Sequence, residues 1–130
     1  MARLTQEQLL EIFNALKKEI KPYEKGTVKA RIDIEGKYDL WSEKENIIAG
    51  RLRKEMNFVT IILQSNYVGF YYMPIYTNCD AVREKLSPEL LKQLKGKACF
   101  HITKTDESVI QDIKQAMKVG YDVYKKNGWV

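Results

Sequence analysis

The chain contains a single histidine and only two cysteines, Cys79 and Cys99, among its 130 residues. Two cysteines cannot form the set of disulfides that stabilises small secreted domains, so we expect reduced thiols and a cytoplasmic protein. No apolar run approaches the roughly 20 residues that a membrane-spanning helix needs. The N-terminal segment also lacks the apolar block of a signal peptide. These features predict a protein with no membrane partner.

Several enzyme classes leave motifs that are missing here. There is no P-loop and no dinucleotide-binding glycine pattern, and the acidic residues are scattered rather than paired for hydrolysis. The net charge of +5 is mild because 22 basic residues are interleaved with 17 acidic ones. It permits an anionic partner but argues against nucleic acid. We therefore expect a non-enzymatic binding or accessory module with no catalytic residues and no cofactor.

The sequence contains enough hydrophobic residues, 45% of the total, to form one core. We expect a single domain over residues 1–130 with a helix near each end. In the first helix Thr5 and Gln8 form a capping box, and Pro22 ends it. Its apolar stripe comprises Leu9, Ile12, Phe13, Leu16 and Ile20. The last helix is capped by Thr105 or Asp106, and its stripe comprises Val109, Ile110, Ile113, Ala116, Met117, Gly120, Tyr121 and Tyr124.

Two hairpins are predicted between these helices. Residues 28–35 alternate between apolar and polar, and a turn at Gly36 leads into a returning strand at 38–42. Its register stays open: a three-residue loop pairs Ile34 with Tyr38, and a two-residue loop pairs Ile32 with Trp41.

In the second hairpin FVTIILQ and YVGFYYMPIY meet across Ser65-Asn66. That turn places one apolar set on the core side: Val59, Ile61, Leu63, Val68, Phe70 and Tyr72. The other face then carries Thr60, Ile62, Gln64, Tyr67, Gly69 and Tyr71.

Two short helices at 79–95 and a strand, KACFHIT, precede the last helix. The expected fold is α+β, an antiparallel five-stranded sheet with the N- and C-terminal helices packed on one face. Only the short helices remain to cover the opposite face. We therefore expect Tyr67, Tyr71 and Thr60 to be partly accessible, and an exposed aromatic patch of this kind favours a homodimer.

Cys99 and His101 share one side of the last strand, and Lys97 is expected on that side too, where it could lower the thiol pKa. This allows a thiol-dependent enzyme using Cys99 as an alternative function. A metal site has less support, because two ligands fall short of the three or four that zinc requires. An ordinary strand with a polar face explains the pair equally simply and is the interpretation we favour.

Two further groups are candidates for ligand binding. Arg51 and Arg53, with Lys54, form a basic cluster. We favour a solvated strand edge whose charge prevents sheet association, and a small anion site is the alternative. The aromatic residues Tyr67, Tyr71 and Trp41, with Gly69, could form the floor of a site, or they could simply reflect the preference of tyrosine for strands. The predicted ligand-binding residues are Cys99, His101, Tyr67, Tyr71, Arg51 and Arg53, with no metal ligands. A small anionic ligand or a protein is the expected partner.

The second half of the chain contains the stretches VGFYYMPIY, SPELLKQLKGKACFHI and IKQAMKVGYDVYKKNGW. Over roughly residues 38–129 this pattern resembles the YdhG-like family of small bacterial domains of unknown function. The resemblance implies an α+β fold and a cytosolic protein, and some relatives are described as frataxin-like iron chaperones. Frataxins present an acidic ridge, whereas the first helix here also carries Lys17 and Lys18. Because of this difference, iron or metal handling is an alternative function rather than the leading one.

Overall fold

The computed structural model describes residues 4–48 and 50–130. Its helices are α1 (Gln6–Ile20), α2 (Met73–Thr77), α3 (Cys79–Arg83), α4 (Pro88–Leu91) and α5 (Glu107–Lys126), with a 3-10 turn at Lys21–Tyr23. Its strands are β1 (Val28–Ile34), β2 (Lys37–Ser42), β3 (Asn46–Ile48), β4 (Arg51–Arg53), β5 (Met56–Leu63), β6 (Val68–Tyr72), β7 (Leu94–Lys95) and β8 (Cys99–Ile102).

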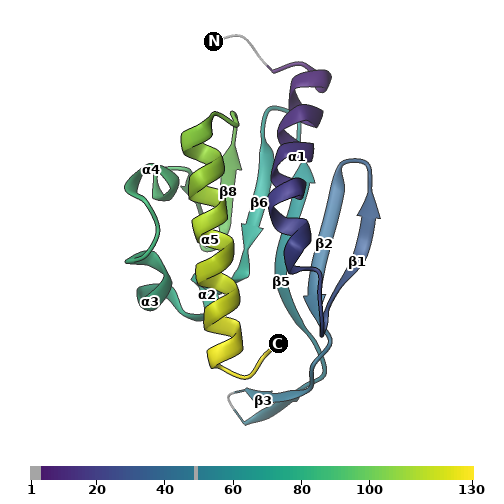
Figure 1. Cartoon of the computed structure of the whole chain (residues 1–130), viewed down its shortest axis with the longest axis vertical. Helices are drawn as coiled ribbons and strands as arrows, with labels where there is room; N and C mark the ends of the chain where they lie inside the picture. Colours follow the sequence, from purple (N-terminus) through teal and green to yellow (C-terminus); the bar gives the residue numbers. More distant parts are fainter. Residues whose placement is uncertain (1–3, 49) are drawn as a thin grey trace.

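The predicted α+β class is confirmed. Six strands form one antiparallel sheet in the order β1-β2-β5-β6-β8-β7. Helices α1 and α5 lie next to each other over one face of this sheet (Figure 1). The sixth strand, β7, is a two-residue edge strand that was not predicted from the sequence. No helix within residues 4–48 and 50–130 is long and apolar enough to cross a membrane.

The terminal helices begin as predicted. In α5 five of the eight predicted stripe residues are buried, Val109, Ile110 and Tyr121 are half-buried, and Val119 is buried although the predicted stripe lacks it. Thr5 and Gln8 form the capping box of α1, and Asp106 rather than Thr105 caps α5 by accepting from the Val109 amide. All five residues of the α1 stripe are buried. Trp129 folds back onto α5, where its ring meets Tyr124 at 5.1 Å.

The β5–β6 hairpin has the predicted register, with Val59 opposite Tyr72 and Leu63 opposite Val68. Neither alternative for the β1–β2 hairpin is correct. Ile34 pairs with Lys37 across a two-residue turn, and the register shifts between Ala30 and Ile32. A β-bulge at this point inserts one extra residue into β1.

The segment after β6 also differs from the prediction. Residues 73–76 continue as helix α2 rather than as strand, because Pro74 lacks the amide hydrogen that a sheet ladder needs. Helices α2 and α3 then contact α5 and extend the helical layer (Figure 1). The short helices therefore do not cover the far side of the sheet. We call that side, opposite α1 and α5, the open face.

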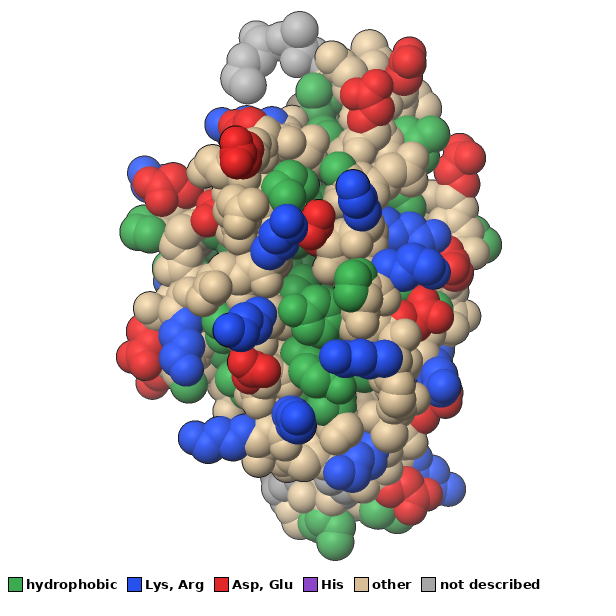
Figure 2. All heavy atoms as spheres, viewed as in Figure 1, with side chains coloured by type: hydrophobic (Ala, Val, Ile, Leu, Met, Phe, Trp, Pro, Cys, Tyr) green, Lys and Arg blue, Asp and Glu red, His purple; other side chains and the backbone are tan. Residues whose placement is uncertain are grey.

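Between α1 and α5 the core reaches the surface. Seen from the helix side, hydrophobic side chains form a band bordered by basic ones (Figure 2). The half-buried rings of Tyr23 and Tyr121 pack together at 5.5 Å, and the Lys25 ammonium lies 4.8 Å from the Tyr121 centroid. This cation–π contact covers part of the exposed aromatic surface on the helix side.

Candidate functional site

The open face is built by strand alternation across the centre of the sheet. In the β5–β6–β8 register, Tyr71 lies between Thr60 and Cys99, and the neighbouring row places Gly69 between Ile62 and His101. Successive residues of a strand point to opposite faces. The residues between these positions, such as Phe70 and Phe100, are consequently buried beneath the helices.

Tyr67 and His101 form a close ring contact on this face. Their rings are stacked, with centroids 3.7 Å apart and an angle of 9° between planes. Both side chains are half-buried, so each stack edge meets solvent. The contact that holds His101 is therefore a ring stack with Tyr67.

Gly69 leaves room for a third ring beside this stack. A Cβ atom added at Gly69 would lie 2.7 Å from Cε2 of Tyr71, so the Tyr71 ring lies across the glycine. The Tyr71 hydroxyl accepts a long hydrogen bond from Gln64 at 3.4 Å. Tyr67, Tyr71 and His101 together with Gly69 form a surface that we call the aromatic platform.

The expected accessibility is confirmed for two of three residues. Tyr67 and Tyr71 are half-buried, but Thr60 is buried with 9% of its surface exposed. The Thr60 hydroxyl donates to Oδ1 of Asp39 at 2.5 Å, which also accepts from the Asn57 amide at 3.1 Å. Oδ2 of Asp39 accepts from the indole of Trp41 at 2.8 Å. This Asp39 network was missed from the sequence, where nothing marks Asp39 as different from other strand carboxylates.

Cys99 adjoins Tyr71 but is not an activated thiol. Burial raises the pKa of Cys99, and the hydrogen bond with Tyr71 opposes that rise only in part. The expectation that Lys97 lowers the thiol pKa is not met, because Lys97 does not contribute to the pKa of Cys99; its ammonium lies 5.8 Å from the Tyr76 ring centroid. Desolvation also raises the pKa of Tyr71, with a further contribution from Cys99. The pair is therefore neutral at physiological pH.

Cys99 should react slowly with iodoacetamide. The thiolate is the nucleophile, so a raised pKa leaves less of it at any given pH and moves the rise in rate above the ordinary value of about 8.5. A Cys79→Ser variant leaves Cys99 as the only thiol, and a Cys99→Ser variant leaves the exposed Cys79 as the comparison. Alkylation rates from pH 6 to 10 by mass spectrometry measure both. A midpoint for Cys99 below 8 would contradict the burial argument.

Metal ligands do not gather around Cys99 and His101. Among residues 4–48 and 50–130, no group of three histidine, cysteine or acidic side chains is placed to hold a metal ion. Two ligands give weak and unselective binding at most.

The remaining predicted residues, Arg51 and Arg53, lie elsewhere. They belong to β4, which pairs with β3 in a separate two-stranded sheet, the β3–β4 arm. The arm joins β5 at Met56, the end of that strand farthest from the turn leading to Tyr67. Arg31 pairs with Glu43 and Glu55, the residues that flank the arm. The structure thus separates the predicted site residues into two groups. Tyr67, Tyr71 and His101 form the platform with Cys99 beside it, and Arg51 and Arg53 lie on the arm.

Two lysines border the platform on opposite sides. Lys37 of β2 lies in the row that contains Ile62 and Gly69, and Lys95 of β7 lies opposite Cys99. Neither ammonium has an ion pair with any residue in the part of the chain described. The aromatic surface is consequently flanked by positive charge on both sides.

Comparison with known proteins adds no relative: no family model, curated protein or solved structure matches the chain. The resemblance to the YdhG-like family therefore remains a prediction from the sequence.

Proposed function

We propose that the chain is a non-enzymatic binding module that holds a small planar anion on the aromatic platform. The observation that carries the proposal is the parallel stack of Tyr67 on His101, on a face that α1 and α5 leave uncovered. Flat aromatic surfaces bind other flat rings through offset stacking and apolar burial. The Tyr71 ring over Gly69 widens that surface.

The charge on the proposed ligand follows from the platform's borders. Lys37 and Lys95 lie on opposite sides and have no ion pair within the described residues, so both are available to a carboxylate or phosphate. Asp39 is engaged by three donors from Trp41, Asn57 and Thr60. Its charge is thereby partly neutralised, which reduces its repulsion of an anion.

The alternatives have less support. A thiol-dependent enzyme needs a thiolate and a base positioned to produce it, but burial favours the protonated form of Cys99. Metal handling needs further ligands beside Cys99 and His101. The cytoplasmic location expected from the sequence stays part of the proposal.

Binding of 2-naphthoate, a planar aromatic anion, tests the proposal. In a ¹H–¹⁵N NMR titration we expect shifts at Tyr67, Gly69, Tyr71 and His101 and a Kd below about 1 mM. Cyclohexanecarboxylate carries the same charge on a puckered ring and should bind at least fivefold more weakly. Equal binding of the two acids, or no shift on the open face at 5 mM 2-naphthoate, would reject the platform as a site.

Variants test the aromatic part and the charged part of the site separately. Gly69→Ala should weaken 2-naphthoate binding about tenfold, because its Cβ displaces the Tyr71 ring. That ring is half-exposed and can move outward, so the melting temperature should change by only a few degrees. The Lys37→Gln/Lys95→Gln double variant should also weaken binding, whereas Lys18→Gln, an exposed lysine of α1, should leave it unchanged.

The homodimer predicted from the sequence would compete for the same face. Light scattering after gel filtration at 10–500 μM measures the association. If the open face is the contact, 2-naphthoate should shift the population toward monomer.

A further inference from the structure

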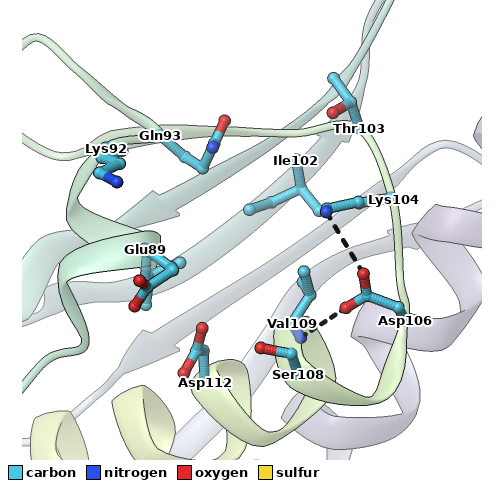
Figure 3. Close-up of a pocket in the computed structure, with 11 residues that line it drawn as sticks. Glu89, Lys92, Gln93, Ile102, Thr103, Lys104, Asp106, Ser108, Val109 and Asp112 are labelled. Atoms are coloured by element: carbon cyan, nitrogen blue, oxygen red, sulfur yellow. Dashed lines mark hydrogen bonds and ion pairs between the residues drawn. The ribbon is translucent and has the colours of Figure 1, made fainter.

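A cavity lies on the helix side of the sheet, away from the aromatic platform. It has a volume of about 230 Å³ and lies between α4, the end of β8 and the first turns of α5 (Figure 3). Ile102 lines it, while the adjacent His101 points to the open face. The two sites therefore share strand β8 but open on opposite sides.

The floor of this pocket is apolar. Leu90 and Ile102 are 3% and 2% exposed, and Val109 from α5 is half-buried beside them. These side chains come from a helix, a strand and a second helix that are each packed into the core. The floor is accordingly a rigid feature of the fold, suited to a hydrocarbon group.

Two of the charged residues at the rim satisfy each other. Asp106 caps α5 by accepting from the Val109 amide at 3.0 Å and pairs with Lys104 at 3.3 Å (Figure 3). The positive end of the α5 dipole is therefore occupied by a carboxylate of the chain itself. Neither the helix terminus nor Lys104 is left to attract an anion.

The carboxylates of Glu89 and Asp112 have no such partner. Neither makes an ion pair or side-chain hydrogen bond with any other residue in the described ranges. In Figure 3 both carboxylates lie toward the same end of the pocket, from α4 and α5 respectively. Lys92 is the one other charged side chain of the rim, so the lining carries three carboxylates against two ammonium groups.

We propose that this pocket binds a small organic cation, with an ammonium group between Glu89 and Asp112 and an apolar body over Leu90, Ile102 and Val109. An anion of the same shape would meet net negative charge at the rim. The volume is below the roughly 300–1,000 Å³ of pockets for drug-sized molecules, which limits the ligand to a short amine. This inference is independent of the platform.

The probe is 2-phenylethylammonium, compared with 2-phenylethanol and phenylacetate. In NMR titrations the ammonium should shift the amides of Leu90, Ile102 and Val109 and bind at least tenfold more tightly than the alcohol. Phenylacetate should not shift them. Equal affinity for ammonium and alcohol would show that the carboxylates do not contribute, and no shift at 10 mM ammonium would show that the pocket does not bind the probe.

Substitutions at Glu89 and Asp112 test whether these carboxylates bind the ammonium group. Asp112→Asn and Glu89→Gln should each weaken 2-phenylethylammonium binding about fivefold, and the double variant should bind it no better than the alcohol. Glu107→Gln removes an acid from the first turn of α5 that does not line the pocket, so it should bind normally. Unchanged binding in the double variant would overturn the proposal, whatever the result with 2-naphthoate on the other face.

Discussion

Replacing Gly120 with valine is expected to lower the free energy of unfolding by about 3 kcal/mol. A Cβ atom at Gly120 would lie 2.7 Å from the Tyr72 hydroxyl, 2.8 Å from Cγ of Pro74 and 2.9 Å from Cε1 of Tyr72. Tyr72 cannot move aside, because it is fully buried and its hydroxyl donates to the carbonyl of Ala116. The glycine thus allows α5 to pack closely against Tyr72 of the sheet and Pro74 of α2.

Helix propensity favours alanine and valine over glycine, so it opposes the steric cost of the added side chain. A loss of stability is therefore specific to the close packing at Gly120. Alanine gains about 1 kcal/mol over glycine within a helix, so Gly120→Ala should cost less than Gly120→Val. Lys118→Val places the same β-branched side chain on the exposed side of α5 and should cost about 0.5 kcal/mol. Urea unfolding followed by circular dichroism measures all three. Equal stability of Gly120→Val and Lys118→Val would contradict the close packing.

The fold could be predicted where local patterns agreed with one another. The β5–β6 register follows from a two-residue turn and from two faces of clearly different polarity, since a slip of one residue would exchange them. The capping box at Thr5 and the stripe from Leu9 to Ile20 are equally local signals. Each of these features depends on residues close in sequence, which is why periodicity was sufficient.

The failures involve contacts between distant residues. Residues 28–34 alternate without interruption, so nothing in them marks the bulge at Arg31. The partners of Arg31 are Glu43, Glu55 and the Trp41 ring, which lies 4.9 Å from its guanidinium carbon. The strand predicted for residues 73–76 is wrong for a local reason instead, because Pro74 lacks the amide hydrogen that a sheet ladder needs.

The candidate site could be predicted only in part, because it too depends on contacts between residues that are distant in sequence. Alternation places Cys99 and His101 on one face of β8, but only the pairing of β8 with β6 brings that face beside Tyr67 and Tyr71. The sequence contains no signal for this pairing, nor for the separate course of the β3–β4 arm. The raised pKa of the Cys99 thiol likewise depends on burial by its neighbours.

Replacing Asp39 with alanine should destabilise the protein by about 2–3 kcal/mol. Its carboxylate accepts from three side chains, Trp41, Asn57 and Thr60, which belong to two adjacent strands. The Asn57 amide has two further acceptors, at 3.2 Å on the Leu40 carbonyl and 3.1 Å on the Thr60 hydroxyl. The Thr60 hydroxyl is the donor most affected, since it is buried and loses its acceptor.

The substitution should also change the platform, because Thr60 lies directly opposite Tyr71. We expect shifts of the Tyr71 ring signals in NMR spectra and weaker binding of 2-naphthoate, beyond the loss of stability. Asp39→Asn keeps one carbonyl acceptor and should retain about half of the stability lost in Asp39→Ala. Asp33→Ala is the matched control, since that carboxylate pairs with Lys17 of α1 on the other side of the sheet and is solvent-exposed. If Asp39→Ala and Asp33→Ala unfold at the same urea concentration, the Asp39 network does not stabilise the open face.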